Sequence, residues 1–207
     1  MEFTYKGLTA TLERMAVTED EIDRQLERLK GQEFPELSPE ELRQTVAESL
    51  QTYYDSRAEE DLLDRLIRSA AETLDYTPSE DDIERGTQAQ MDSFTAQLAQ
   101  RNLTIEAYCS FMNTSEAQIR EDIRLDAVQM LKIRAAIERI AELERVEATQ
   151  EDIQNACVAI CRQNQITAEE LKELYDEAFA EAVRFSVISE KVLHLVRAEA
   201  KITEIPA

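Results

Sequence analysis

Cys157, Cys161 and His194 are the residues whose types could bind a metal ion. The two cysteines lie four positions apart on a predicted helix, and His194 is the only histidine in the chain. Two thiolates and one imidazole would supply three of the four ligands that zinc requires. Free cysteines are also common small residues of protein cores. We favour core positions for Cys157, Val158, Ile160 and Cys161 and an ordinary helical position for His194, and we predict no metal and no other cofactor.

Two acidic clusters could carry acid–base chemistry or bind a cation, namely Glu59-Glu-Asp61 and Ser79-Glu-Asp-Asp82. Both fall in exposed registers or first turns of predicted helices, where negative charge complements the helix dipole. We therefore interpret them as solvated faces and helix caps. The sequence contains no Gly-rich phosphate-binding loop, no Gly-x-Ser-x-Gly and no His-Glu-x-x-His. It predicts neither an enzyme nor an ATP-driven mechanism.

The composition favours long helices and excludes some partners. The 207 residues are 43% hydrophobic and include only three Gly and four Pro. The formal net charge of −21 repels phosphate backbones and anionic lipids, so we expect no nucleic-acid and no membrane partner. No apolar run of about eighteen residues could span a membrane, and the first ten residues do not form a signal peptide. The three cysteines are expected to be free thiols in a cytoplasmic protein.

The hydrophobic pattern of the first third predicts one strand and two helices. Alternation from Phe3 to Leu12 indicates a short N-terminal strand. Thr18 begins a helix that reaches about Lys30, and residues 31–39 form a hinge. A helix then begins at Ser38-Pro39 and continues to about residue 75, with an apolar residue at every fourth position. It would be about 55 Å long, which exceeds the diameter of a compact chain of this size, so we expect an elongated molecule.

Six more helices are predicted, at residues 79–101, 104–111, 115–146, 149–164, 167–176 and 179–200. The helix at 115–146 has one apolar stripe in its first half, formed by Ile119, Ile123 and Ala127. Its second half is apolar almost all round, which predicts a helix running from a projecting arm into a body. Those apolar residues are Val128, Met130, Leu131, Ile133, Ile137, Ile140 and Leu143. The predicted fold class is mostly all-α, an elongated helical body with projecting arms and a short N-terminal strand.

The order of several short motifs carries a family resemblance. A short helix breaks at Asn113-Thr114, and a Ser115-capped helix follows with Arg-Glu-Asp-Ile-Arg near its start, Ile-Ala-x-x-Glu near its end and a Thr149-x-x-Asp152 restart. Tyr76-Thr-Pro, Lys201-Ile-Thr-Glu and Lys6-Gly-Leu-Thr extend the pattern in both directions. Together they resemble the C-terminal, substrate-cradling domain of trigger factor, the bacterial nascent-chain chaperone, with its connector. The resemblance implies a connector at residues 1–34 and a chaperone body with arms at 35–207.

Two other trigger factor domains have no counterpart in these residues. The Gly-Phe-Arg-type loop of the ribosome-docking domain is not found, and Gly31-Gln-Glu-Phe34 leads directly into Pro35-Glu-Leu-Ser-Pro39. An FKBP-type isomerase domain would not fit between the connector helix and the next helix. We therefore expect neither ribosome docking nor prolyl isomerisation from this chain.

A crowded group of apolar residues is the candidate client-binding site. Adaptable Met and aromatic side chains suit loose binding of varied apolar peptides, although they could instead pack the helices of the arm together. The resemblance implies that such arms hold clients on scattered apolar patches. The predicted function is an ATP-independent holdase for unfolded or nascent polypeptides. The alternatives are an adaptor or assembly protein for one folded partner and a SurA-like secretory chaperone core, and a homodimer is left open. The candidate residues are Met91, Phe94, Leu98, Leu103, Tyr108, Phe111 and Met112.

Overall fold

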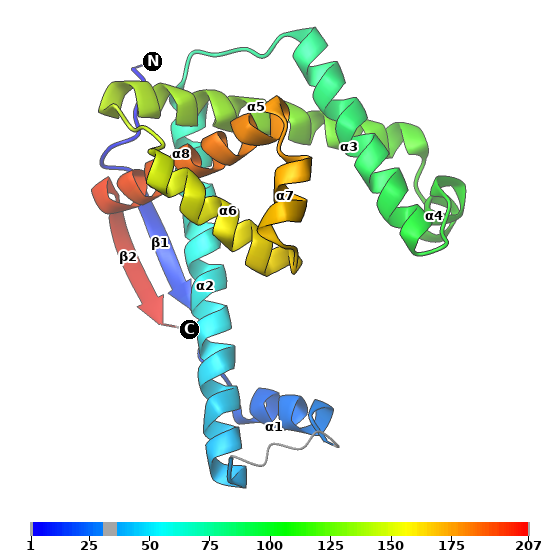
Figure 1. The fold of residues 1–207 in the computed structure, drawn as a ribbon, viewed down its shortest axis with the longest axis vertical. Coiled ribbons are helices and arrows are strands. Elements are labelled where there is room, and N and C mark those ends of the chain that lie inside the picture. Colours follow the sequence, from blue (N-terminus) through cyan, green and yellow to red (C-terminus); the bar gives the residue numbers. More distant parts are fainter. Residues whose placement is uncertain (1, 31–36, 207) are drawn as a thin grey trace. The chain divides into compact units, whose positions relative to one another are not determined.

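The computed structural model describes residues 2–30 and 37–206, and most of them are helical. The predicted helical fold class is thereby confirmed. The chain divides into two compact units, which are described separately (Figure 1). Unit 1 comprises residues 1–5 and Ile67–Leu195, and unit 2 comprises Lys6–Leu66 and Val196–Ala207. The predicted hinge and the predicted boundary at residue 34 lie largely in 31–36, outside the described residues.

Unit 2 contains a pair of parallel strands that lie along a long helix (Figure 1). β1 (Thr9–Arg14) pairs with β2 (Lys201–Pro206), and the register begins at Thr9 opposite Lys201. An N-terminal strand was predicted from the alternation between Phe3 and Leu12, but the observed strand begins only at Thr9 and extends to Arg14. Its C-terminal partner was not predicted. Leu12 of β1 is fully buried, as are Leu62 and Leu66 of α2 (Pro39–Thr73). The 35-residue α2 is unbroken, so the predicted long helix is confirmed.

The two helices that begin in the first part of unit 2, α1 and α2, each start after a capping residue. α1 (Glu19–Arg28) begins after Thr18, whose backbone N–H and hydroxyl both donate to the Glu21 carboxylate, at 2.9 and 2.8 Å. α2 begins after Ser38, whose backbone N–H donates to the carboxylate of Glu41 at 2.8 Å. Arg43 of α2 pairs with both Glu19 and Asp23 of α1. These contacts join α1 to the first turns of α2.

Unit 1 is built from the end of α2, most of α8 (Glu177–Glu199) and five helices between them. Most of these helices begin with a Ser or Thr cap, and three end at a non-glycine residue in the left-handed conformation. All of the predicted boundaries agree with the structure within two residues, because caps are local signals. The five helices are α3 (Glu80–Gln100), α4 (Ile105–Met112), α5 (Glu116–Glu144), α6 (Gln150–Asn164) and α7 (Ala168–Leu174).

The core of unit 1 is formed by the second half of α5 together with α2 and α8. Ile133 and Ile140 of α5 are buried, and so is Val187 of α8. The Tyr5 hydroxyl donates to Glu144 at the end of α5, at 2.6 Å. The prediction of burial all round this half of α5 is wrong, because Met130 is 55% exposed and Leu143 is 46% exposed.

The candidate metal ligands are not gathered into a site. Within residues 2–30 and 37–206, no group of three or more His, Cys, Asp or Glu side chains could hold a metal ion. Cys157 and Cys161 are half-buried free thiols, and His194 is exposed beside Glu190. The predicted core position of Val158 is wrong, because this side chain is 51% exposed. No membrane-crossing helix is found in the described part of the chain, where each helix is too short or too polar.

Candidate peptide-binding surface on the helical arm

The arm of unit 1 consists of α3, α4 and the first half of α5. α3 packs against α5, and α4 lies at the end of this pair where α3 ends and α5 begins (Figure 1). Gly86 of α3 faces Ala127 of α5, since a Cβ atom added at Gly86 would lie at an ordinary contact distance of 3.5 Å from the Cβ of Ala127. Small residues on both helices therefore place the α3–α5 contact beside the apolar stripe of α5.

Ion pairs on the surface of the arm align α3 with α5. Arg120 of α5 donates to Gln88 at 3.1 Å and pairs with Glu84, while Arg124 pairs with Glu80 at 2.7 Å. The hydrogen bond to Glu80 raises the pKa of Arg124. Each exposed pair adds little stability because water screens the charges, but the three contacts share one register. These charged side chains therefore act mainly to fix the alignment of α3 against α5.

Hydrogen bonds fix the turn from α3 into α4. The Leu103 N–H donates to the Leu98 carbonyl at 2.9 Å, and Asn102 is in the left-handed conformation with φ of 55°. Thr104 then caps α4 by accepting from the Ala107 N–H at 3.2 Å. The backbone N–H of Glu106 and the Thr104 hydroxyl lower the pKa of the Glu106 carboxyl. The turn is therefore an ordered connection that holds α4 in place.

At the other end of α3, Ser79 caps the helix. Its hydroxyl accepts from the Asp82 N–H at 3.2 Å and donates to the Asp82 carboxylate. This hydroxyl is the main cause of the lowered pKa of Asp82, and Arg85 adds to it. The interpretation of Ser79-Glu-Asp-Asp82 as a helix cap is confirmed.

The seven candidate residues divide between the interior and the surface of the arm. Met91 and Leu98 are buried, at 5% and 6% exposure, and they pack the arm itself. Phe94 lies edge-on to Tyr108 with 5.2 Å between ring centroids, so these half-buried rings join α3 to α4. Leu103 is also half-buried. For these five, the structure favours the alternative in which the residues hold the arm together.

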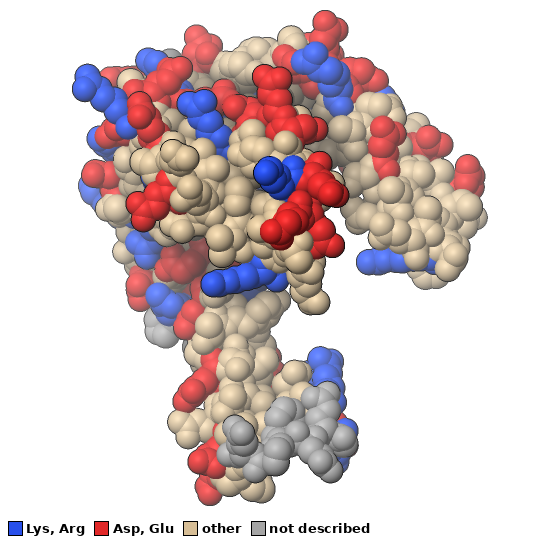
Figure 2. Space-filling model, viewed as in Figure 1, with Lys and Arg blue, Asp and Glu red and all other residues tan. Residues whose placement is uncertain are grey.

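Phe111 and Met112 form an apolar tip at the end of α4. Phe111 is 86% exposed and Met112 is 53% exposed. Figure 2 shows the end of the arm as a mostly uncharged surface, in contrast to the mixed charges over the rest of unit 1. These two side chains are the members of the candidate set that can contact another molecule without any rearrangement of the arm.

Sequence reasoning missed the exposure of three apolar residues on α5, one of which is Leu143 at 46%. Leu125 is 62% exposed and Met130 is 55% exposed. Leu125 is two residues from both Ile123 and Ala127, which places it about 200° around the helix from the apolar stripe. The sequence did contain a signal for the exposure of Leu125. This apolar residue lies between Arg124 and Asp126, on the helix face opposite the apolar stripe.

Exposed apolar side chains also lie on the other helices of unit 1. Val158 is on α6, Leu174 is at the end of α7, and Tyr175 follows it. The Tyr175 ring packs against Phe179 with 5.5 Å between centroids. Unit 1 thus carries several small apolar patches on different elements, and its described residues include no group of His, Cys, Asp and Glu side chains that could hold a metal ion. Such a surface can bind apolar side chains weakly at several places.

Comparison with known proteins places the chain in a family. The family described as "Bacterial trigger factor protein (TF) C-terminus" matches residues 38–198. The trigger factor of Geobacillus sp. (strain WCH70) is 28% identical over 135 residues, which cover 65% of this chain and 32% of that protein. The trigger factor of Alkaliphilus metalliredigens is 23% identical over 203 residues, which cover 92% of this chain and 47% of that protein. The chain thus spans about a third to a half of these relatives.

Two solved structures share the fold. A structure of trigger factor domains from Thermotoga maritima superposes with a TM-score of 0.54 at 17% identity, covering 74% of this chain and 90% of that one. A hypothetical Mycoplasma protein superposes with a TM-score of 0.53 at 12% identity, covering 99% of this chain and 88% of that one. Given the match over residues 38–198, this chain belongs to the trigger factor C-terminus family.

Proposed function

We propose that this chain is a chaperone that works without ATP, holding unfolded or nascent polypeptides through apolar side chains exposed on its helical arm. The observation that carries the proposal is the apolar tip, where Phe111 is 86% exposed beside Met112. Exposing so large an apolar side chain to water is unfavourable. Its exposure at an ordered helix end therefore fits a role in binding another molecule. Membership of the trigger factor C-terminus family supports the same function.

The scattered arrangement of the patches explains how such a surface could hold varied clients. Fully burying one Phe or Met side chain is worth about 1.5–3 kcal/mol, which by itself gives only weak binding. A client that touches the arm tip and other exposed patches of unit 1 gains avidity from several weak contacts. Weak individual contacts also allow rapid release, which a holdase without an energy source requires.

An adaptor for one folded partner is the main alternative, and it predicts a single contiguous apolar patch. The exposed apolar residues of unit 1 instead lie on four different helices or their ends, represented by Phe111, Leu125, Val158 and Leu174. This distribution favours the chaperone.

The experiment that tests the proposal measures suppression of aggregation of a chemically unfolded model protein without nucleotide. Phe111→Ser and Met112→Ser should each weaken suppression several-fold, because each removes apolar surface at the tip. Met130→Ser is the matched control, because Met130 has nearly the same exposure as Met112, at 55% against 53%, but lies in the middle of α5. As one of the secondary patches, Met130 should contribute less, so this change should weaken suppression less than either tip variant. Tip variants that suppress as well as the wild type, or a control that fails equally, would contradict a binding role centred on the tip.

We further propose that the chain has no prolyl isomerase activity. α1 ends at Arg28 and α2 begins at Pro39, so only ten residues connect the two helices. A connection of ten residues is too short to contain a folded domain with an enclosed proline pocket. A proline-peptide isomerisation assay should show the background rate at micromolar protein, and acceleration well above it would refute this part of the proposal.

A further inference from the structure

The four methionines of the described residues differ sharply in exposure. Met15 and Met112 are each 53% exposed and Met130 is 55% exposed, whereas Met91 is 5% exposed inside the arm. The thioether of a methionine is oxidised to a sulfoxide when an oxidant reaches its sulfur atom. An oxidant in solution can therefore reach three of these side chains, while the arm shields the fourth.

Met112 differs from the other two exposed methionines in its surroundings. It is the last residue of α4, and the neighbouring Phe111 is 86% exposed. The Thr114 N–H donates to the Cys109 carbonyl at 3.0 Å, so the end of α4 is closed by an ordered turn. Figure 2 shows the end of the arm as a mostly uncharged surface. A polar oxygen on the Met112 sulfur would therefore change the character of the apolar tip itself.

Met130 has charged neighbours on its own helix. Asp126 and Arg134 lie four residues before and after it, on the same side of α5. Arg134 also pairs with Glu138 at 2.9 Å. A sulfoxide at Met130 would thus add a polar group to a surface that is already charged.

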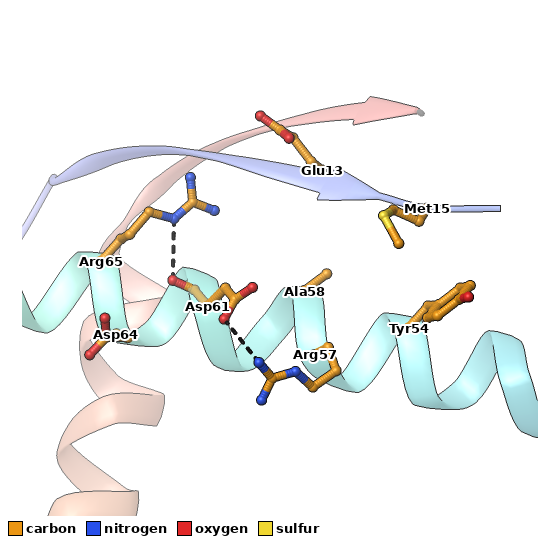
Figure 3. A pocket seen from close by; sticks show the side chains of 8 residues that line it. All are labelled: Glu13, Met15, Tyr54, Arg57, Ala58, Asp61, Asp64 and Arg65. Carbon is orange, nitrogen blue, oxygen red and sulfur yellow. Dashed lines mark hydrogen bonds and ion pairs between the residues drawn. The ribbon is translucent and has the colours of Figure 1, made fainter. Parts of the chain in front are cut away.

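Met15 belongs to unit 2, whereas the apolar tip belongs to unit 1. Figure 3 shows it just beyond the end of β1, with the Tyr54 ring projecting from α2. Arg57 and Asp61 line the same cavity of about 470 Å³. Oxidation of Met15 would therefore take place among charged groups and would leave the surface of the apolar tip unchanged.

The oxidation is a transfer of one oxygen atom and two electrons. A lone pair of the thioether sulfur attacks one oxygen of hydrogen peroxide, so that an S–O bond forms while the O–O bond breaks. The sulfur is oxidised to the sulfoxide, and the leaving hydroxide takes the proton of the transferred oxygen and becomes water. The product is polar, and methionine sulfoxide reductases convert it back to the thioether.

We propose that Met112 is a reversible oxidation site, at which peroxide converts the apolar tip into a surface that holds clients less well. The inference rests on the proposed function, because it concerns the regulation of the same surface. A sulfoxide oxygen binds water and must lose it when an apolar client covers the tip, which makes the contact less favourable. Phe111 is chemically unchanged, so client binding is weakened and not abolished. Met91 stays reduced, so the arm keeps its fold.

The first measurement follows oxidation of the whole chain in hydrogen peroxide by mass spectrometry of its proteolytic peptides. Met15, Met112 and Met130 should react at similar rates. Met91 should react at least about tenfold more slowly, because a buried side chain is reached only after local opening. The oxidised chain should unfold at the same urea concentration as the untreated one. Oxidation of Met91 as fast as Met112, or a lower unfolding midpoint, would overturn the inference.

The second measurement compares suppression of aggregation before and after peroxide, each variant against its own untreated sample. The wild type should lose about threefold or more, because one apolar contact of the tip is lost. Leucine has no sulfur atom to oxidise, so Met112→Leu should lose less than about 1.5-fold on the same argument. Met15→Leu and Met130→Leu are the matched controls and should lose nearly as much as the wild type. A loss in Met112→Leu equal to that of the wild type would refute Met112 as the site.

A further control separates the methionines from the half-buried thiols Cys109, Cys157 and Cys161. Dithiothreitol added after the peroxide returns sulfenic acids and disulfides to thiols but leaves methionine sulfoxide in place. The loss of suppression should persist in dithiothreitol. It should be reversed by the two methionine sulfoxide reductases, one for each sulfoxide epimer. Full recovery in dithiothreitol alone would assign the effect to the cysteines and refute the inference.

The outcomes for this inference and for the proposed chaperone function are distinguishable. If the untreated wild type suppresses aggregation and the Met112-oxidised protein does so equally well, only the oxidation site is refuted. If the untreated wild type does not suppress aggregation, the chaperone function is refuted, and the regulation proposed for it is refuted with it.

Discussion

Glu59 of α2 binds Arg197 of α8 through both carboxylate oxygens, with distances of 3.1 Å to Nε and 3.2 Å to Nη2. Both side chains are about one-third exposed. Arg14 of β1 lies 3.8 Å from the same carboxylate and 3.1 Å from Asp55. This group of charges joins the end of α8 and the first strand to the middle of α2 within unit 2. The interpretation of Glu59 as part of a solvated acidic face is therefore wrong.

Glu59→Gln should destabilise the chain by about 1 kcal/mol, because the amide keeps the shape but cannot bind the guanidinium with two anionic oxygens. The measurement is the free energy of unfolding in urea at low salt. Glu60→Gln is the control, since Glu60 pairs with the exposed Arg57 on the same helix, and it should change stability by less than about 0.5 kcal/mol. Equal losses of unfolding free energy in the two variants would show that the bidentate pair of Glu59 with Arg197 contributes no more than an exposed ion pair.

Glu21 should make the stability of unit 2 depend on pH in the acid range. The Tyr54 hydroxyl, followed by the Thr18 backbone and hydroxyl, lowers the pKa of Glu21 to about 2. A carboxyl with a depressed pKa in the folded state stabilises the protein above its ordinary pKa of about 4.3. That contribution is lost as the pH falls from about 4.3 to about 2. NMR titration of the Glu21 carboxyl should give the low pKa, and Tyr54→Phe should raise it. An unchanged pKa in that variant would contradict the assigned cause.

Gly86→Ala should stabilise the arm by about 0.5–1 kcal/mol. Gly86 is inside a helix, where alanine is favoured, and the new Cβ would lie at an ordinary contact distance of 3.5 Å from Ala127. Gly7→Ala is the opposing control. Gly7 has a φ of +69°, a conformation that costs a residue with a side chain about 1–2 kcal/mol. Thermal unfolding should therefore show a higher midpoint for Gly86→Ala and a lower one for Gly7→Ala, and a reversal of either sign would contradict the backbone argument.

Leu98 and Phe111 should respond differently to truncation, although both were candidates for client binding. Leu98→Ala empties a buried site and should cost about 2–5 kcal/mol. Phe111→Ser alters a side chain that is 86% exposed and should change stability by no more than about 0.5 kcal/mol. Urea unfolding of the two variants is the measurement. A large loss for Phe111→Ser would mean that the tip is part of the core of the arm in solution.

The helical architecture was predictable from sequence because its signals are local. A cap such as Ser79 or Ser115 acts on backbone groups three residues away, and apolar spacing along one helix reports its own buried face. Residues 39–73 contain no internal helix breaker, so the length of α2 followed directly. The apolar stripe of Ile119, Ile123 and Ala127 likewise identified the side of α5 that packs against another helix.

What the sequence alone determined was therefore the number, type and limits of the helices, the arm as an apolar-rich segment and the family resemblance. Only the tertiary structure decided that Lys201–Pro206 pairs with β1, that Glu59 meets Arg197, and that Phe111 is exposed while Leu98 is buried. Leu98 and Phe111 have similar hydrophobicity and belong to neighbouring helices, so no local pattern distinguishes them. The physical reason is that burial and strand pairing depend on partners far away in the chain, 138 residues away in the case of Glu59 and Arg197.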